Sequence, residues 1–256
     1  MSSPSSVTAV GGSATEEEHS ASSAGRVIRV LRAFAKMPWL TKLCCLWLMV
    51  VILAAALADL IPGLADPNYQ GFVFGNGNTN EGPTASHWLG TDNVSRDILA
   101  RLIYGARVSL IFAFSLAAVG IIVGGTLGSI AGYFRGLLET FLMALVDTWL
   151  SFPALIGLVF ITTMLGMRNL VVLVLVGAMF IWPSYTRIAR ATALSVSGQA
   201  FVTAARAIGT SRKRILVREI FPNVLPALLA YSLVGLPVLI ILESTLSFLG
   251  LGVEIP

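Results

Sequence analysis

The sequence predicts an all-α polytopic membrane helix bundle, because its composition is too apolar for a soluble fold. Of its 256 residues, 56% are hydrophobic and only 12% are charged, and the mean hydropathy is +0.84. A helix that spans a bilayer needs about 20 mostly apolar residues. Runs of this kind predict five crossings, at about 43–61, 108–131, 141–165, 170–185 and 225–248.

The chain before the first apolar run predicts a flexible tail followed by an uncleaved helix. Residues 1–25 are rich in Ser, Ala and Gly and include three consecutive glutamates, a composition that buries too little apolar surface to order itself. A signal peptide is the alternative for the run at 43–61, but the basic region before it is too long. We therefore predict a flexible cytoplasmic tail at 1–25 and a transmembrane domain at 26–256.

Basic residues predict that the N-terminus is cytoplasmic, because Lys and Arg are retained on that side of short loops. In this orientation, thirteen of the 17 Lys and Arg residues lie in the N-terminal tail, the turn at 132–138 and the loop at 186–224. The net charge of +4 is then explained by membrane topology. No recognisable nucleic-acid-binding fold accompanies it, so nucleic acid is not an expected partner.

The second apolar run carries glycine at every fourth position. The series consists of Gly120, Gly124, Gly128, Gly132 and Gly136. A spacing of four keeps these positions near one helix face, where another helix backbone can approach closely. Packing within this chain and an interface with a second subunit both fit the pattern, and we favour packing within the chain.

Two carboxylates fall within the apolar runs, Asp147 in VDTWLSFP and Glu243 in ESTLSFLGLG. Charge is costly inside a bilayer, so each should face protein or water and have a partner. Arg187 and Arg190 are predicted partners of Asp147. A proton relay is one hypothesis, but we favour a structural pair or a position near the interface. Our candidates for the translocation path or gate are Glu243, Ser247 and Asp147.

The segment before the second run predicts an irregular outer region and then a helix on the membrane surface. Residues 63–90 are rich in Gly, Asn and Pro and could form a docking surface. Asp92 is predicted to cap an amphipathic helix that lies at the interface before the crossing. Asp97 and Arg101 are four residues apart and are predicted to pair.

The segment 199–223, QAFVTAARAIGTSRKRILVREIFPN, predicts a helix, a sharp turn and a second helix. Gly209 suits the left-handed position that follows a helix, and Thr210 or Ser211 can cap the second helix. That helix is predicted to end before Pro222.

The apex of this segment combines small residues with basic ones, a shape suited to seating in a groove of another protein. A basic loop resting on anionic lipid is the alternative. The spacing of Ala204 and Ala205 to Gly209 and then to Pro222 resembles the EAA loop of ABC importer permeases, which carries the helix that inserts into the ATPase subunit.

Flanking segments narrow the resemblance. HWLGTDNVSRDILARLIYGARVSL, VDTWLSFP and ESTLSFLGLG resemble the corresponding segments of dipeptide, oligopeptide and nickel permeases, particularly the second permease subunit of dipeptide-type systems. The resemblance covers roughly residues 30–256. Thr203 stands where the family usually has Glu, Ser95 where Gly is common, and Phe221 where Leu is usual.

The resemblance implies a type I ABC importer permease fold in the bacterial plasma membrane. It implies a second homologous permease, two ATPase subunits that bind ATP and Mg, an extracytoplasmic solute-binding protein, and no cofactor on this chain. The sixth crossing of the family would follow Pro256. The residues that the resemblance assigns to ATPase coupling are Thr203, Ala204, Ala205, Arg206, Gly209, Arg212 and Pro222.

The sequence has neither a GxxxxGK[ST] phosphate-binding motif nor a recognisable catalytic or metal-binding cluster. A transporter subunit without its own ATPase site is therefore predicted. An ion- or proton-coupled secondary transporter is the alternative, and it would need coupling-ion sites near the bilayer midplane and often an internal repeat. A membrane-anchoring or assembly protein is a third possibility.

Overall fold

The computed structural model describes residues 38–61, 64, 66–68, 79–166 and 169–253. These residues are helical apart from connecting segments, and contain no β-strand beyond one isolated bridge. The tail predicted at 1–25 lies outside the described residues.

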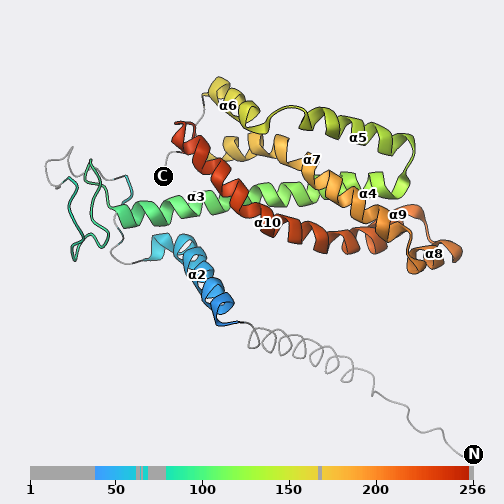
Figure 1. The fold of residues 1–256 in the computed structure, drawn as a ribbon, viewed down its shortest axis with the longest axis horizontal. Helices are drawn as coiled ribbons and strands as arrows, with labels where there is room; N and C mark the ends of the chain where they lie inside the picture. The colour runs from blue at the N-terminus through green and yellow to red at the C-terminus, as the bar shows by residue number, and fades with distance from the viewer. Residues whose placement is uncertain (1–37, 62–63, 65, 69–78, 167–168, 254–256) are drawn as a thin grey trace, which may run out of the picture. The chain divides into compact units, whose positions relative to one another are not determined.

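Figure 1 shows the helices. In chain order they are α2 (Trp39–Ala56), the 3-10 helix η1 (Ala58–Leu60), α3 (Ile98–Val119), the π-helical segment η2 (Gly120–Gly124), α4 (Gly125–Phe134), α5 (Leu137–Leu150), α6 (Ala154–Leu165), α7 (Leu170–Ser197), α8 (Ala200–Ala207), α9 (Arg212–Ile215), the π-helical segment η3 (Leu216–Ile220) and α10 (Phe221–Phe248).

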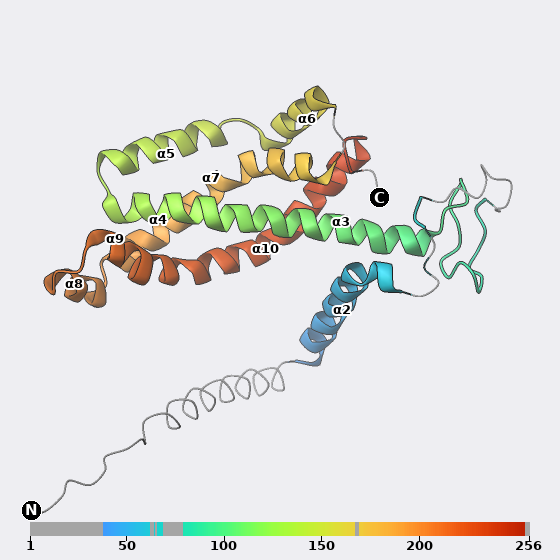
Figure 2. The ribbon, with the colours of Figure 1, turned by 180° about the vertical axis from the view of Figure 1, so that it is seen from behind.

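The chain divides into two compact units, Met1–Leu53 and Ala54–Pro256. The first unit holds most of α2, an apolar helix of which only 6% is buried. The second unit holds all the other helices that the structure describes. Within it, α3 and α4 form one long rod along which α7 and α10 lie (Figure 2).

Four helices of the described chain are long and apolar enough to cross a membrane, or five if the bent pair α5 and α6 is one broken span. The other spans are α2, the 37-residue rod from α3 to α4, the 28-residue α7, and the 37-residue helix from α9 to α10. The pair α5 and α6 bends by 73° next to Pro153, which cannot donate a backbone hydrogen bond. The protein is therefore an all-α polytopic membrane protein, and up to five spans agree with the five predicted.

Two helices extend well beyond the bounds that hydropathy predicts. The fourth span, predicted to end at Tyr185, continues to Ser197. The second helix of the basic segment does not end before Pro222, because this proline lies in the first turn of α10, where a missing backbone N–H is tolerated. The connection between α7 and the long helix from α9 to α10 therefore consists of residues 198–211, and it is shorter than the predicted loop at 186–224.

The predicted interfacial helix is wrong, because its residues form the first turns of α3 and continue directly into the span. The predicted cap at Asp92 is also wrong. The helix begins at Ile98, and the cap is Asp97, whose carboxylate accepts a hydrogen bond of 2.8 Å from the Ala100 backbone N–H.

The closest contact in the second unit joins α4 and η2 to α7. Four glycines form this contact, and we call them the glycine face: Gly120, Gly124, Gly128 and Gly132. A Cβ atom at Gly128 would lie 2.3 Å from the Thr186 carbonyl oxygen and 2.6 Å from the Ala189 Cβ. The close approach that the spacing predicts is thus made within this chain. Gly136 does not join it, because it lies in the next turn with φ +70° and open space around it.

Two buried apolar clusters complete the second unit. One surrounds Tyr185 and reaches α8 and α9 through Val202 and Ile215. The other joins α3, α6, α7 and α10 around Phe112 and Leu246. Helices α8 and α9 are therefore fixed to the bundle and lie at one end of it (Figure 1).

Candidate functional site

The most prominent candidate site is a knob formed by residues 200–215, which comprise α8, the turn at Ile208–Ser211 and α9. Gly209 has φ +82°, as predicted for the left-handed residue after a helix. Its N–H donates to the Arg206 carbonyl at 3.0 Å, and the Thr210 N–H donates to the Ala205 carbonyl at 3.1 Å. This pair of bonds is the Schellman arrangement, which ends a helix sharply.

One side of the knob packs against the bundle. Val202 and Ile215 are fully buried, and Ala205 is half-buried against the same apolar cluster. The small side chain of Ala205 therefore serves internal packing, and it does not lie on the open surface of the knob. Ser211 occupies the position before α9 but makes no capping bond through its side chain.

The opposite side of the knob is open. Thr203 and Ala204 are exposed, and Ile208 at the tip is 82% exposed. Sequence reasoning did not single out Ile208. The signal that could have found it is an isolated apolar residue directly before the turn glycine in a basic segment. Pro222 is exposed on α10 and lies outside the knob.

The basic residues of the knob differ in their surroundings. The Arg206 guanidinium lies 5.2 Å from the centroid of the Tyr133 ring, at the end of α4. This contact holds the charge close to the bundle without neutralising it. Arg212 is exposed at the start of α9.

A second candidate site surrounds Glu243, whose side chain is only 4% exposed. The Ser109 hydroxyl on α3 donates to Glu243 Oε2 at 2.6 Å, and the Ser247 hydroxyl on α10 donates to Oε1 at 3.0 Å. The carboxylate faces protein and has partners, as its burial predicts. Ser109 lies 134 residues earlier in the chain, and no pattern in the sequence indicates that it is one of these partners.

The chain after α10 folds back over this network. A Cβ atom at Gly252 would lie 2.0 Å from the Ser247 hydroxyl oxygen, so this position requires glycine. Gly250, with φ +76°, makes the reversal possible. The returning segment therefore packs against Ser247, one of the two hydrogen-bond partners of Glu243.

Asp147 has a different environment. Arg187 Nη2 lies 2.6 Å from Asp147 Oδ1, which agrees with one of the two predicted partners. Both side chains are more than half exposed, at 54% and 60%, so the pair lies on the surface of this chain. The predicted pairing of Asp147 with Arg190 is wrong, because Arg190 Nε donates a hydrogen bond to Glu139 at 2.7 Å. Both pairs link α5 to α7.

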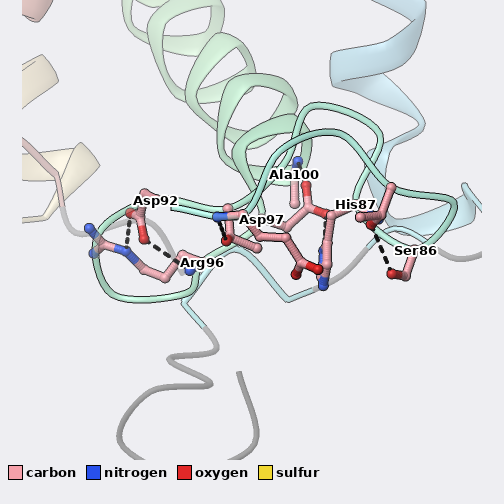
Figure 3. A network of polar contacts seen from close by, with 9 residues as sticks. Ser86, His87, Asp92, Arg96, Asp97 and Ala100 are labelled. Carbon is pink, nitrogen blue, oxygen red and sulfur yellow. Dashed lines mark hydrogen bonds and ion pairs between the residues drawn. The ribbon is translucent and has the colours of Figure 1, made fainter. Parts of the chain in front are cut away.

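The start of α3 carries a polar network, which Figure 3 shows from close by. The Asp92 carboxylate accepts hydrogen bonds from the Val94 and Arg96 backbone N–H groups, at 3.0 and 2.9 Å. It also pairs with the guanidinium groups of Arg96 and Arg101, at 2.8 and 3.0 Å. His87 Nδ1 lies 2.8 Å from Asp97 Oδ2.

This network replaces the predicted pair of Asp97 with Arg101. Arg101 pairs with Asp92. The Asp97 carboxylate instead contacts His87 Nδ1 and accepts a hydrogen bond from the Ala100 backbone N–H. Burial opposes ionisation of Asp92, but hydrogen bonds from the backbone and from Arg96 outweigh it. The pKa of Asp92 therefore lies below its ordinary value.

Ser95, in the same loop, has φ +60°. This left-handed conformation favours glycine, so the loop geometry gives a physical reason for the glycine that the resembling family commonly has there.

Residues 124–256 match the family described as the binding-protein-dependent transport system inner membrane component. The matched segment contains most of the glycine face, the knob, Asp147 and Glu243. The chain belongs to this family. As an inner membrane component, it is a multi-pass transport protein.

Three relatives extend the match beyond this segment. The glutathione transport system permease protein GsiD of Pectobacterium atrosepticum is 34% identical over 179 residues, which cover 69% of this chain and 58% of that protein. The dipeptide permease protein DppC of Alkalihalophilus pseudofirmus is 32% identical over 217 residues, covering 84% of this chain and 70% of that protein. The oligopeptide permease protein OppC of Haemophilus influenzae is 35% identical over 170 residues, covering 66% and 54%.

The relatives are named as permeases of dipeptide, oligopeptide and glutathione transport systems. The chain spans 58% of the Pectobacterium atrosepticum protein and 54% of the Haemophilus influenzae protein, which is less than two thirds of either.

Proposed function

We propose that this inner membrane component is a permease subunit of an ATP-driven ABC importer that moves short peptides or a related solute across a bacterial plasma membrane. The observation that carries the proposal is the knob, whose inner side is buried while its tip presents an exposed apolar residue. Family membership and the names of the relatives support it.

The knob has the features of a rigid contact surface for another protein. Val202 and Ile215 anchor it, and the turn at Gly209 fixes the direction of its tip. Ile208 then presents apolar area that gains free energy when a partner buries it. Because the base of the knob packs on α4, α7 and α10, a force on its tip reaches the spans directly.

The proposed assembly contains a second homologous permease, two ATPase subunits and an extracytoplasmic solute-binding protein. ATP and Mg bind to the ATPase subunits, which receive the knob in the cytoplasm. Basic residues near the knob and in the N-terminal tail favour this orientation. Closure of the ATPases then moves the spans between inward-open and outward-open states, the alternating access that domain closure can drive.

The network of Glu243, Ser109 and Ser247 is our candidate for a gate element at the opposite end of the bundle from the knob. The Ser109–Glu243 hydrogen bond joins α3 to α10 through a buried carboxylate, so separation of these two helices must break it. Asp147 is a weaker candidate for the path, because its partner Arg187 is as exposed as Asp147 itself.

Reconstitution into liposomes tests the function. The chain is combined with candidate ATPase and second permease subunits, and uptake of a labelled dipeptide from the binding protein is followed. Uptake should require hydrolysable ATP and persist when ion gradients are collapsed. Uptake that follows an ion gradient without ATP would instead establish a secondary transporter.

A further inference from the structure

A pocket of about 410 Å³ lies between the end of α4 and the knob. Its lining residues come from four parts of the chain: Tyr133 and Phe134 from α4, Arg206 from α8, Thr210 from the turn and Arg212 from α9.

The positive charge in this pocket is uncompensated. Two of the five lining residues are arginines and none is acidic. Neither Arg206 nor Arg212 forms an ion pair among the described residues. Stacking on the Tyr133 ring restricts the Arg206 guanidinium but leaves its charge available to an anion. The pocket is therefore suited to an anionic group.

Tyr133 adds an independent observation. It is 7% exposed, and its hydroxyl is buried without a hydrogen-bond partner among the described residues. Burying such a group costs free energy unless a partner is supplied. A ligand that reached this hydroxyl would supply the missing bond.

The surroundings of the pocket distinguish a lipid from a protein side chain. Phe134 is the last residue of the 37-residue span, so the pocket lies at the end of this span. Leu137 and Leu138, which follow directly, are 90% and 45% exposed. A phosphate headgroup with acyl chains would use both the basic pocket and this apolar surface, whereas a carboxylate side chain would use only the charge.

We propose that this pocket binds the phosphate of an acidic phospholipid from the leaflet on the side of the knob. Arg206 and Arg212 donate hydrogen bonds to the phosphate oxygens, and Phe134 and Leu137 contact the acyl chains. The proposal requires that this end of the span lies at the membrane surface, and it depends on neither the ATPase partner nor the transported solute.

The test uses the full chain purified in a neutral detergent and titrated with dioctanoyl phosphatidylglycerol, while the thermal midpoint is followed. The midpoint should rise saturably, whereas dioctanoyl phosphatidylcholine at the same concentrations should change it little. Arg212→Gln should weaken the apparent affinity for phosphatidylglycerol about fivefold. Arg206→Lys, which keeps the charge but loses the planar group, should also weaken it.

Arg214→Gln is the matched control, because Arg214 is exposed on α9 but does not line the pocket. It should leave the affinity within about twofold. An equal response to phosphatidylcholine, or unchanged affinity in both pocket variants, would overturn the proposal. Inorganic phosphate that replaces the lipid at equal concentration would identify a free anion as the occupant. Loss of ATPase binding by Arg212→Gln with unchanged lipid affinity would assign the pocket to a protein contact.

Discussion

The glycine face and the knob both contain small residues, yet the two regions use them in opposite ways. At the glycine face, atoms of α7 occupy the space that a side chain would need, at 2.3 to 2.7 Å. At the knob, Gly209 has no heavy atom within 4 Å of the position of its absent Cβ, and it serves the turn. The first region is completed within the chain, whereas the second presents a surface that the chain does not cover.

This difference predicts the largest loss of stability at the glycine face. Gly128→Val would place a branched side chain against the backbone of Thr186, which cannot move without shifting α7. The free energy of unfolding should fall by about 3 kcal/mol, the upper part of the usual range for overpacking. Thermal unfolding in detergent measures it.

Gly105→Val is the control, because Gly105 lies in the same helical rod with open space around its Cβ position. Its effect should be small. Equal destabilisation by both variants would show that the glycines matter for the helix itself and not for contact with α7.

The next largest effect concerns the buried carboxylate. Ser109→Ala removes one of the two hydroxyl donors to Glu243 and should lower the free energy of unfolding by about 2 kcal/mol. In a Glu243→Gln background the same change should cost less, because the charge that needs the donor is gone. Ser115→Ala, on the same helix, serves as the control.

The polar network at the start of α3 predicts a smaller, pH-dependent effect. The pKa of Asp92 is lowered in the folded protein, so its ionised form contributes stability well above its ordinary pKa of about 3.9. That contribution is lost as the pH falls through the ordinary value toward the lowered one.

Hydrogen exchange of the Val94 and Arg96 amides, corrected for intrinsic rates, should therefore be constant from about pH 7 to 5 and increase below about pH 4. Asp92→Asn should remove this dependence. Exchange that increases equally in both proteins as the pH falls would assign the dependence to another group.

The smallest effect among the charged groups is expected at Asp147. Its pair with Arg187 is exposed on both sides, so Asp147→Asn should lower the free energy of unfolding by less than about 1 kcal/mol. The unfolding midpoint measured at increasing salt concentration checks that the pair is exposed. The difference in midpoint between the variant and the unsubstituted protein should become smaller as the salt concentration rises. A loss comparable to that of Ser109→Ala would mean that the pair is buried in the assembled protein.

Local patterns predicted the parts of the fold that local physics determines. Apolar runs predicted the spans, and the spacing of four predicted the close helix contact at the glycine face. Gly209 predicted the turn of the knob. The exact helix ends were missed because hydropathy ignores amphipathic extensions: α7 continues to Ser197 along a buried stripe that includes Ala189 and Ala193.

Partners distant in sequence could not be predicted. Ser109 donates a hydrogen bond to Glu243 only because α3 packs on α10. Asp92 forms an ion pair with Arg101 only because the loop before α3 turns back. The π-helical segments also give no pattern in hydropathy, and one of them coincides with the start of the glycine face. Ile208 was missed because its exposure depends on which side of α8 the bundle covers.

The most direct test of the account is the Ile208→Ser variant, measured for both unfolding and ATPase copurification. The free energy of unfolding should stay within about 0.5 kcal/mol, because the side chain is exposed, while copurified ATPase should fall about tenfold. Val217→Ser, at another exposed apolar position outside the knob, should change neither. ATPase retained by Ile208→Ser, or lost equally by both variants, would contradict the knob as the coupling surface.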